Sequence, residues 1–407
     1  MVEATRLMSI HASTRRLLGA ALIGAVLAGS QALASPSTAI SDGGPEAGLQ
    51  AIFQDIENNR LDSALTRTET LLKYYPNFRL GHLIKGDLLL SRSGALKTFG
   101  NAKGASSENI DDFRAEAIAR LRGYRDRPKT NSVPRYLLEM SAGQAYAVVV
   151  DTKRSRLYVY RNDKGKPRFV ADYYVTHGKA GSDKWREGDK RTPIGVYHVT
   201  SAIPGDKLAD LYGSGAFPIN YPNEWDKREK RTGHGIWLHG TQSDTYSRPP
   251  LASDGCVVLA NQDFNALSNF VTPGETPVII SDQIEWLSLD SWQAERTALN
   301  KAIESWRRDW ESRDSDRYLA HYASSFRSDK QDRSDWVKAK RQINASKEWV
   351  KVKLDELSMF RNPGSEEMVV VTFKQDYRSN NLTDTFRKRQ YWIKEQGQWK
   401  IAYEGPA

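Results

Sequence analysis

The spacing of apolar residues changes twice along the chain, and these changes constrain the fold more than any other feature of the sequence. From Gly48 to about Gly123, apolar residues recur every three or four positions, which is typical of amphipathic helices. Between residues 135 and 283, short runs rich in β-branched and aromatic residues are separated by turns, which is typical of strands. From residue 286, helical spacing returns and then gives way to longer strand-like runs. The sequence therefore predicts a multidomain protein.

The helical region, residues 48–127, contains a helix pair that resembles a tetratricopeptide unit, with Pro76 closing it. One such unit cannot bury both of its apolar faces. We therefore expect these helices to pack on another part of this chain or on a second copy of it; the oligomeric state stays open. The segment "RPKTNSVPR", residues 127–135, is rich in proline and polar residues and marks the next domain boundary.

The region 135–283 shows no regular alternation of helices and strands, so we predict a mostly-β, mostly antiparallel domain rather than a doubly wound one. In the C-terminal region, 286–407, Trp306 and Trp310 share a helical face, and a shorter helix is expected around residues 318–326. Strand-like runs follow, so this region is predicted to be an α+β domain. Its order of elements resembles the nuclear-transport-factor-2-like (NTF2-like) fold, which implies a pocket.

The N-terminus has the pattern of a secretory signal peptide over residues 1–34: basic residues, the apolar run "LLGAALIGAVLAG" and the small-x-small site "ALAS". The apolar run is shorter than the roughly 20 residues that a membrane span needs. We therefore expect an exported, periplasmic protein without a transmembrane segment. The net charge of +9 favours an anionic envelope partner, and export argues against nucleic acid.

Cys256 is the only cysteine, so no intramolecular disulfide can form, and it is either a small buried residue or a nucleophile. A cysteine attacks a carbonyl carbon as a thiolate and usually needs a histidine to take its proton. His239 ends the strand-like run "IWLH", and a loop that returns to the same sheet edge would bring the two together. Gly255 permits a sharp turn that aims amide hydrogens at a developing oxyanion.

These residues form a pattern that resembles the signature of the YkuD-type L,D-transpeptidase catalytic domain, a family that remodels bacterial peptidoglycan. The matching positions are His239, Gly240, Thr241, Ser253, Gly255, Cys256, Val257, Leu259, Asn261 and Asp263. An upstream segment, "GDKRTPIGVYHV", also resembles the family through Thr192, Pro193, Gly195 and Tyr197. The resemblance covers roughly residues 140–283. Two positions depart from it, since Asp254 stands where many members have His or Lys, and Val258 where many have Arg.

The resemblance implies that Cys256 attacks the carbonyl of the L-centre of diaminopimelate in a tetrapeptide stem, releasing D-alanine and leaving a thioester. His239 would be the general base and acid, and the main-chain amides of Gly255 and Cys256 would bind the oxyanion. Gly240 and Ser253 would shape the site. The candidate substrate contacts are Tyr197, Trp237, Asp254 and Asn261, with Tyr197 and Trp237 alternatively in the core.

No cofactor and no metal are expected. His177 and His234 could be imagined as zinc ligands beside His239, but the sequence has no short ligand spacing such as His-Glu-x-x-His.

The acceptor that resolves the thioester decides the activity. An amine of another stem gives a transpeptidase, which is our first expectation; a protein lysine gives an anchored lipoprotein, and water gives a carboxypeptidase. A helical N-terminal part with an NTF2-like tail resembles the L,D-carboxypeptidases that trim tetrapeptides to tripeptides and set cell shape. Asp254 and Val258 also leave open an inactive, peptidoglycan-binding protein. For the C-terminal domain we expect packing against the neighbouring domain, with an envelope protein or glycan as the alternative ligand of its pocket.

Overall fold

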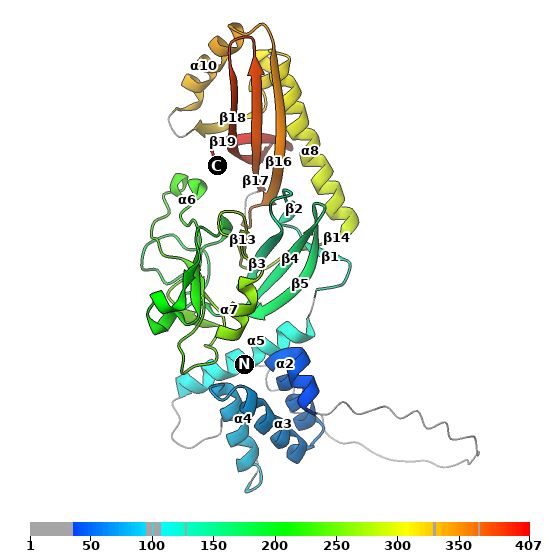
Figure 1. Cartoon of the computed structure of the whole chain (residues 1–407), viewed down its shortest axis with the longest axis vertical. Helices are drawn as coiled ribbons and strands as arrows, with labels where there is room; N and C mark the ends of the chain where they lie inside the picture. The colour runs from blue at the N-terminus through cyan, green and yellow to red at the C-terminus, as the bar shows by residue number, and fades with distance from the viewer. Residues whose placement is uncertain (1–35, 95–99, 101–106, 127, 329–330, 365–366) are drawn as a thin grey trace, which may run out of the picture.

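The computed structural model describes residues 36–94, 100, 107–126, 128–328, 331–364 and 367–407. Three parts are stacked along the longest axis of the molecule (Figure 1): helices at one end, a β-rich middle domain, and an α+β domain at the other end. The predicted multidomain organisation is confirmed. The expected signal peptide, residues 1–34, lies outside the described residues. Among the helices that are described, none is long and apolar enough to cross a membrane.

The N-terminal part consists of helices that pack on one another and on the middle domain. They are α2 (Pro36–Glu57), which is interrupted at Gly44, α3 (Leu61–Tyr74), α4 (Arg79–Leu90) and α5 (Ser107–Arg125). Leu49, Leu71 and Phe78 are fully buried in their shared core. Tyr246 and Ala260 of the middle domain belong to the same apolar cluster. The helices were expected to cover their second apolar face either with another part of this chain or with a second copy of it. The structure shows packing on the middle domain of the same chain.

A buried arginine strengthens this junction. Arg120 of α5 is 1% exposed and forms ion pairs with Glu46 and Glu116. Its guanidinium carbon lies 4.0 Å from the ring centroid of Tyr174 in the middle domain. Ser247 Oγ, also in the middle domain, donates a 2.6 Å hydrogen bond to Glu116. Buried charges are stable only when they are paired and hydrogen-bonded, so the helices and the middle domain depend on each other at this point.

The middle domain is built from two mixed sheets that enclose an apolar core. One sheet has the order β5-β4-β3-β13-β7 and the other β12-β10-β9-β8, while β6 pairs with β11. Most neighbours are antiparallel, as predicted; β3–β13, β10–β12 and β6–β11 are parallel. The strands are β3 (Tyr146–Asp151), β4 (Arg156–Asp163), β5 (Lys166–Tyr174), β6 (His177–Gly178), β7 (Gly195–His198), β8 (Ile203–Pro204), β9 (Gly215–Pro218), β10 (Trp237–His239), β11 (Leu251–Ser253), β12 (Val257–Val258) and β13 (Pro277–Ser281). The helices are α6 (Glu224–Arg228) and α7 (Asn261–Ser268), and a 3₁₀ turn spans Asp210–Tyr212.

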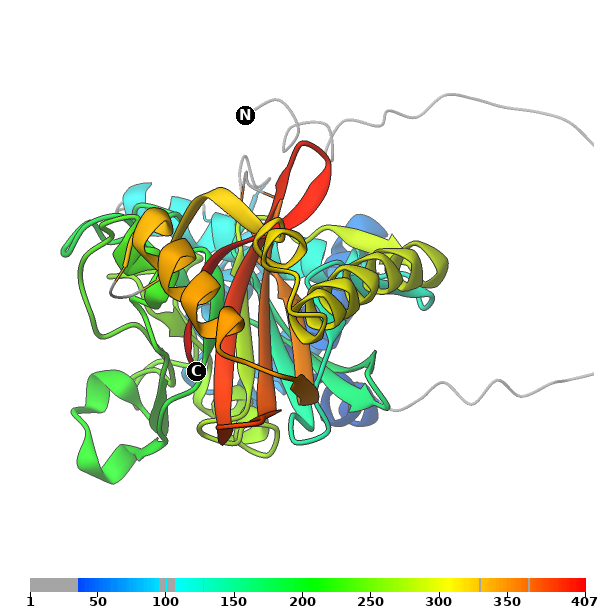
Figure 2. The same ribbon diagram turned by 90° about the horizontal axis from the view of Figure 1, so that it is seen from above.

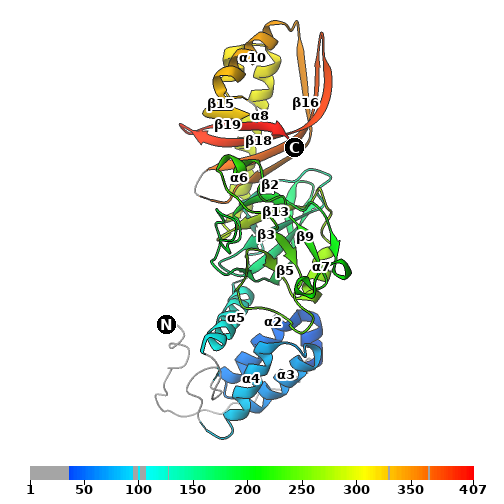
Figure 3. The ribbon, with the colours of Figure 1, turned by 90° about the vertical axis from the view of Figure 1, so that its left-hand side faces the viewer.

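The C-terminal domain wraps helices against one side of a long curved sheet (Figure 3). Its elements are α8 (Leu289–Glu311), α9 (Ser315–Leu319), β15 (Tyr322–Ser328), α10 (Arg333–Ala345), β16 (Val350–Arg361), β17 (Met368–Ser379), β18 (Thr383–Glu395) and β19 (Gln398–Pro406). Seen from above, α10 lies at the left and α8 at the right of this domain (Figure 2). Trp292, Trp306 and Trp310 of α8 are in the core of this domain.

One predicted helix is only partly present. The sequence indicated a helix around residues 318–326, but α9 ends at Leu319 and the strand β15 begins at Tyr322. Tyr322 and Phe326 are both buried. A spacing of four places two side chains on the same face of a helix and also on the same face of a strand, so the pattern could not separate the two.

The middle and C-terminal domains share backbone hydrogen bonds. β2 (Leu137–Glu139) precedes the middle domain in the chain, yet it pairs with β16 at the edge of the C-terminal sheet. Beside it, β1 (Ser132–Pro134) pairs with β14 (Trp286–Ser288), which leads into α8. The segments that enter and leave the middle domain are therefore held together.

Candidate active site

Cys256 lies in a tight turn between β11 and β12. Ser253 Oγ closes this turn by donating a 2.6 Å hydrogen bond to the carbonyl of Cys256 and accepting one of 3.2 Å from the N–H of Gly255. Gly255 has a φ of 127°, and a Cβ built on it would lie 2.7 Å from the carbonyl oxygen of Arg191. Both observations require glycine at this position, so the residue before the cysteine is set by backbone conformation and by a close contact.

His239 ends β10, and Cys256 directly precedes β12. The strands are parallel, with Leu238 opposite Val257 and His239 opposite Val258. Leu238 and Val257 face the apolar core. Because side chains alternate along a strand, His239 projects from the face opposite Leu238. Cys256 directly precedes Val257, so the two residues that the sequence singled out lie on adjacent parallel segments of the chain.

The hydrogen bond of the His239 ring determines which nitrogen can take a proton. Nδ1 lies 2.6 Å from the carbonyl oxygen of Gly240, which can only accept a hydrogen bond, so Nδ1 carries the hydrogen. Nε2 is then the basic nitrogen of the neutral ring. Burial lowers the pKa of His239 to about 4, although the bond to Gly240 raises it, and the positive charge of Arg248 lowers it further. At neutral pH the imidazole is therefore an uncharged base.

The thiol is also uncharged at rest. Burial raises the pKa of Cys256, the main-chain hydrogen bond from Trp237 lowers it, and the charge of Asp254 raises it again. The Sγ–H group donates to the carbonyl of Gly235 at 3.4 Å. The site therefore holds a neutral thiol beside a neutral imidazole, and a proton must leave sulfur when the thiol attacks.

The main-chain amides of Gly255 and Cys256 are the predicted oxyanion donors. The Gly255 N–H already donates to Ser253 Oγ, so it is not available while this turn is intact. The upstream segment supports the turn from the other side, because Thr192 Oγ1 donates to the carbonyl of Gly255 and accepts from the N–H of Gly178, both at 2.9 Å. The Cys256 amide is the remaining main-chain candidate.

Asn261 supports the backbone around the histidine. Its Oδ1 accepts hydrogen bonds from the N–H groups of Ser214 and Thr241, at 2.9 and 3.1 Å, and its Nδ2 donates to the carbonyl of Thr241 at 2.7 Å. A Cβ at Gly240 would lie 2.2 Å from Asn261 Oδ1. These contacts make Asn261 a structural support for the loop after His239, whereas the sequence had placed it among the candidate substrate contacts.

The other predicted site residues lie in different surroundings. Tyr197 is 2% exposed and its hydroxyl donates to the carbonyl of Ile194, so it belongs to the core, as one of the two sequence alternatives had it. Asp254 is exposed beside the thiol and its carboxylate lies 3.4 Å from Lys179 Nζ. Trp237 is half-buried. Val258, where the family pattern has arginine, is 3% exposed.

Two neighbours of the site carry no motif, and the sequence analysis missed them. The Tyr212 ring packs between Trp237 and His239, with ring centroids 4.9 and 5.0 Å away. Arg248 is half-buried and interacts electrostatically with Cys256. Tyr212 ends the 3₁₀ turn and Arg248 lies on a loop, and their approach to the histidine and cysteine depends on the tertiary structure.

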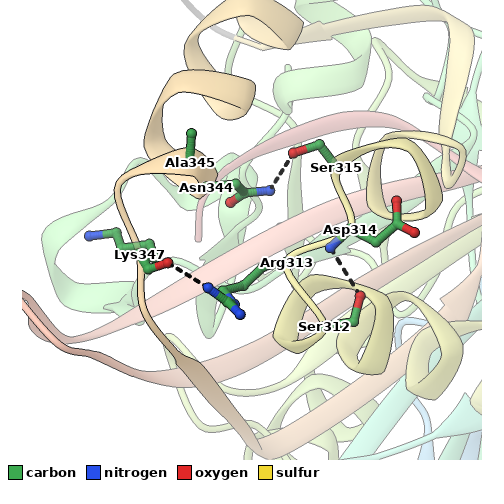
Figure 4. A pocket seen from close by; sticks show the side chains of 7 residues that line it. All are labelled: Ser312, Arg313, Asp314, Ser315, Asn344, Ala345 and Lys347. Carbon is green, nitrogen blue, oxygen red and sulfur yellow. Dashed lines mark hydrogen bonds between the residues drawn. The ribbon is translucent and has the colours of Figure 1, made fainter.

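Two hollows elsewhere in the molecule do not include the candidate nucleophile. One, of about 550 Å³, lies at the far end of the C-terminal domain, where Arg313 donates to the carbonyl of Lys347 and Asn344 donates to Ser315 (Figure 4). The other, of about 510 Å³, lies between the middle and C-terminal domains and is lined by Trp185 and Met368 among others. Among the described residues, no three His, Cys, Asp or Glu side chains are grouped to hold a metal ion.

Comparison with known families agrees with this arrangement. The L,D-transpeptidase catalytic domain (YkuD) matches residues 145–280, and the Cds6 C-terminal NTF2-like domain matches residues 298–405. The matches therefore fall on the middle and C-terminal domains. No curated protein sequence matches the chain significantly.

Two solved structures are similar to about two thirds of this chain. Bdellovibrio bacteriovorus Bd1075 is 30% identical with a TM-score of 0.61, and the match covers 68% of this chain and 98% of that one. The helical cell shape determining protein Pgp2 from Campylobacter jejuni is 25% identical with a TM-score of 0.57, and the match covers 66% of this chain and 95% of that one.

Proposed function

Because the chain belongs to the YkuD family of L,D-transpeptidases, we propose that it is an exported cysteine acyl-transfer enzyme of peptidoglycan. The observation that carries this proposal is that His239 ends β10 while Cys256 directly precedes β12, the strand that pairs in parallel with β10. A nucleophile and a base in that arrangement suit acyl transfer through a covalent intermediate. The donor is a tetrapeptide stem that contains diaminopimelate, as the family resemblance implies.

The neutral resting pair defines the order of proton movements. As the Cys256 sulfur bonds to the carbonyl carbon, His239 Nε2 takes the thiol proton, and the carbonyl π electrons move onto oxygen. When the tetrahedral intermediate collapses, the C–N bond breaks and the imidazolium returns the proton to the nitrogen of D-alanine. This leaves a thioester and a neutral base. The hydrogen bond from Nδ1 to Gly240 keeps the ring oriented through both transfers.

The acceptor then resolves the thioester. Attack by an amine of a second stem, with its proton passing to His239, gives a cross-link. This is the first candidate, and the family of the catalytic domain supports it. Attack by water gives L,D-carboxypeptidase activity. This second candidate is favoured by the similarity to a helical cell shape determining protein, which spans 66% of this chain and 95% of that one.

Purified disaccharide tetrapeptide, incubated with the protein and analysed by mass, tests the proposal. Dimers would identify a transpeptidase, and tripeptide with free D-alanine a carboxypeptidase. Cys256→Ala and His239→Gln should abolish both products. His198→Gln is the matched control, because burial also lowers the pKa of His198 to about 4, but it neighbours Arg389 and Glu224.

Intact mass after exposure to a carbapenem reports on the nucleophile separately. The wild-type protein should gain the mass of the drug, and Cys256→Ala should not. A protein that binds the tetrapeptide but forms neither product nor adduct would be a peptidoglycan-binding protein instead, and the proposal would be wrong.

A further inference from the structure

Arg248 lies in the loop between β10 and β11 and is held by neutral acceptors alone. Its Nε donates to Thr241 Oγ1 at 3.1 Å, and its Nη2 donates to Gln242 Oε1 at 2.6 Å and to the carbonyl of Leu211 at 2.9 Å. Within the described part of the chain, Nη1 has no hydrogen-bond partner. These contacts fix the plane of the guanidinium and leave the N–H groups of Nη1 free to bind a ligand.

The charge of Arg248 is not neutralised by a carboxylate of the described residues. None of their Asp or Glu oxygens lies within 4.0 Å of it, and Asp254 pairs with Lys179 instead. Burial lowers the pKa of Arg248, while the Asp254 carboxylate and, when it forms, the Cys256 thiolate raise it. A half-buried cation without a counter-ion is costly, so this arrangement calls for an anion that the protein itself does not supply.

The main chain of Arg248 is anchored by two side chains of the middle domain. Its carbonyl accepts hydrogen bonds from the hydroxyls of Tyr174 and Thr176, both at 2.9 Å. The preceding Ser247 donates to Glu116 of α5, and Tyr246 packs on Phe78 with a centroid distance of 5.1 Å. The helical part of the chain thus fixes the loop that carries the guanidinium.

The proposed donor substrate places an anion at the required position. In a tetrapeptide stem the departing D-alanine is the last residue, so its carboxylate follows directly after the scissile bond. Consecutive Cα atoms are about 3.8 Å apart, so this carboxylate lies within one residue of the carbon that Cys256 attacks. A guanidinium binds a carboxylate through parallel hydrogen bonds, which adds selectivity as well as affinity.

We propose that Arg248 binds the terminal carboxylate of the donor stem and thereby selects the last peptide bond for cleavage. The inference rests on the proposed function and adds a specificity residue to it. Many members of the family have an arginine where this protein has Val258, which is 3% exposed. Arg248 supplies a cation at the site from another position in the chain. A stem that continues beyond the fourth residue, or that ends in an amide, would lack the anion that Arg248 binds.

The test compares a tetrapeptide ending in a free carboxylate with the same tetrapeptide ending in an amide, using the full-length protein. Wild-type kcat/KM should favour the acid by about 10- to 100-fold, which is the range expected for a hydrogen bond to a charged group. Arg248→Gln should remove most of this preference by lowering kcat/KM for the acid alone. Arg248→Lys should keep part of it. Arg168→Gln, which changes an arginine with 67% side-chain exposure on β5, should behave as wild type.

The ratio of the two substrates separates substrate recognition from a merely structural role. If Arg248 only closed its loop, Arg248→Gln would reduce turnover of both substrates equally, and that result would overturn the proposal. A wild-type protein that cleaves acid and amide equally well would overturn it without any variant.

A binding measurement keeps the inference independent of turnover. In the Cys256→Ala background, calorimetric titration should show tighter binding of the acid than of the amide with Arg248 present, and equal binding with Arg248→Gln. Equal affinities in both proteins would refute the role of Arg248. If the acid binds preferentially but wild type forms no product, the proposed function fails and the carboxylate site stands.

Discussion

Replacing Asn261 with alanine is the sharpest test of how the loop around His239 is held. The change removes the hydrogen bonds from Ser214 N–H and Thr241 N–H to Oδ1, and the one from Nδ2 to the carbonyl of Thr241. At a net value of about 1 kcal/mol for each bond, the free energy of unfolding should fall by about 3 kcal/mol. Partial exposure lets water replace some of these partners, so about 3 kcal/mol is an upper value.

Catalysis should suffer as well, because the loop supported by Asn261 contains Gly240, whose carbonyl orients the His239 ring. A base displaced by about 1 Å loses roughly 100-fold in rate. We therefore expect kcat for tetrapeptide turnover to fall by about 10- to 100-fold in Asn261→Ala, with a smaller change in KM.

Urea unfolding followed by circular dichroism, together with turnover, measures both effects. Asn265→Ala is the matched control, since Asn265 is exposed on the same helix and its side chain makes no hydrogen bond to any described residue. It should unfold and turn over as wild type does. If the two variants share one unfolding midpoint and one kcat, Asn261 does not hold the loop and the reasoning is refuted.

Four further predictions concern the pH dependence of turnover, the reactivity of the thiol, the turn before it and the helical part. Because burial lowers the pKa of His239 to about 4, kcat/KM should persist as the pH falls from 7 to 5 and decline only near 4; half-loss near pH 6.5 would contradict this. Alkylation of Cys256 by iodoacetamide should be slow at pH 7 and still rise above pH 9, since the pKa of this thiol is raised; a plateau by pH 8 would show otherwise. Gly255→Ala should remain folded but form carbapenem adduct at least about 10-fold more slowly by intact mass, because its Cβ would meet the Arg191 carbonyl at 2.7 Å, whereas an unchanged rate would mean that the turn adapts. Tyr246→Ala should loosen the helical part by about 3 kcal/mol and speed proteolysis near residue 128, and an unchanged digestion rate would argue against this junction.

The parts of the fold that follow from local periodicity could be predicted from the sequence. The strands β16–β19 were recognised because long runs of β-branched and aromatic residues are flanked by turns, and α8 because Trp306 and Trp310 share a helical face. The predicted helix beyond Leu319 failed at Tyr322 and Phe326, where a spacing of four satisfies both types of element. Only pairing with β19 settles that choice.

In the candidate site, too, some residues could be recognised from the local sequence and others only from the tertiary structure. Cys256 and His239 were singled out because a thiol and a histidine suit nucleophile and base, and because His239 ends a recognisable strand-like run. The surroundings could not be predicted, since they depend on which loops meet. Nothing local in the sequence indicates that Ser253 Oγ accepts a hydrogen bond from the N–H of Gly255, or that the charge of Arg248 lowers the pKa of Cys256. Asn261 was noticed through the family pattern, but its role became visible only from its partners.

The pairing of β2 with β16 means that the catalytic domain is, in topological terms, an insertion into the C-terminal domain. The chain first contributes one edge strand, next builds the whole catalytic domain, and only afterwards completes the sheet that this strand belongs to. A fragment that begins at Trp286 would lack the edge strand and leave part of β16 open to pairing with other chains. Main-chain hydrogen bonds, rather than a flexible tether, set the orientation of the two domains. A glycan or protein held by the C-terminal domain would therefore be presented at a fixed distance and direction from Cys256, so the choice of where the wall is modified could be made by the domain that performs no chemistry.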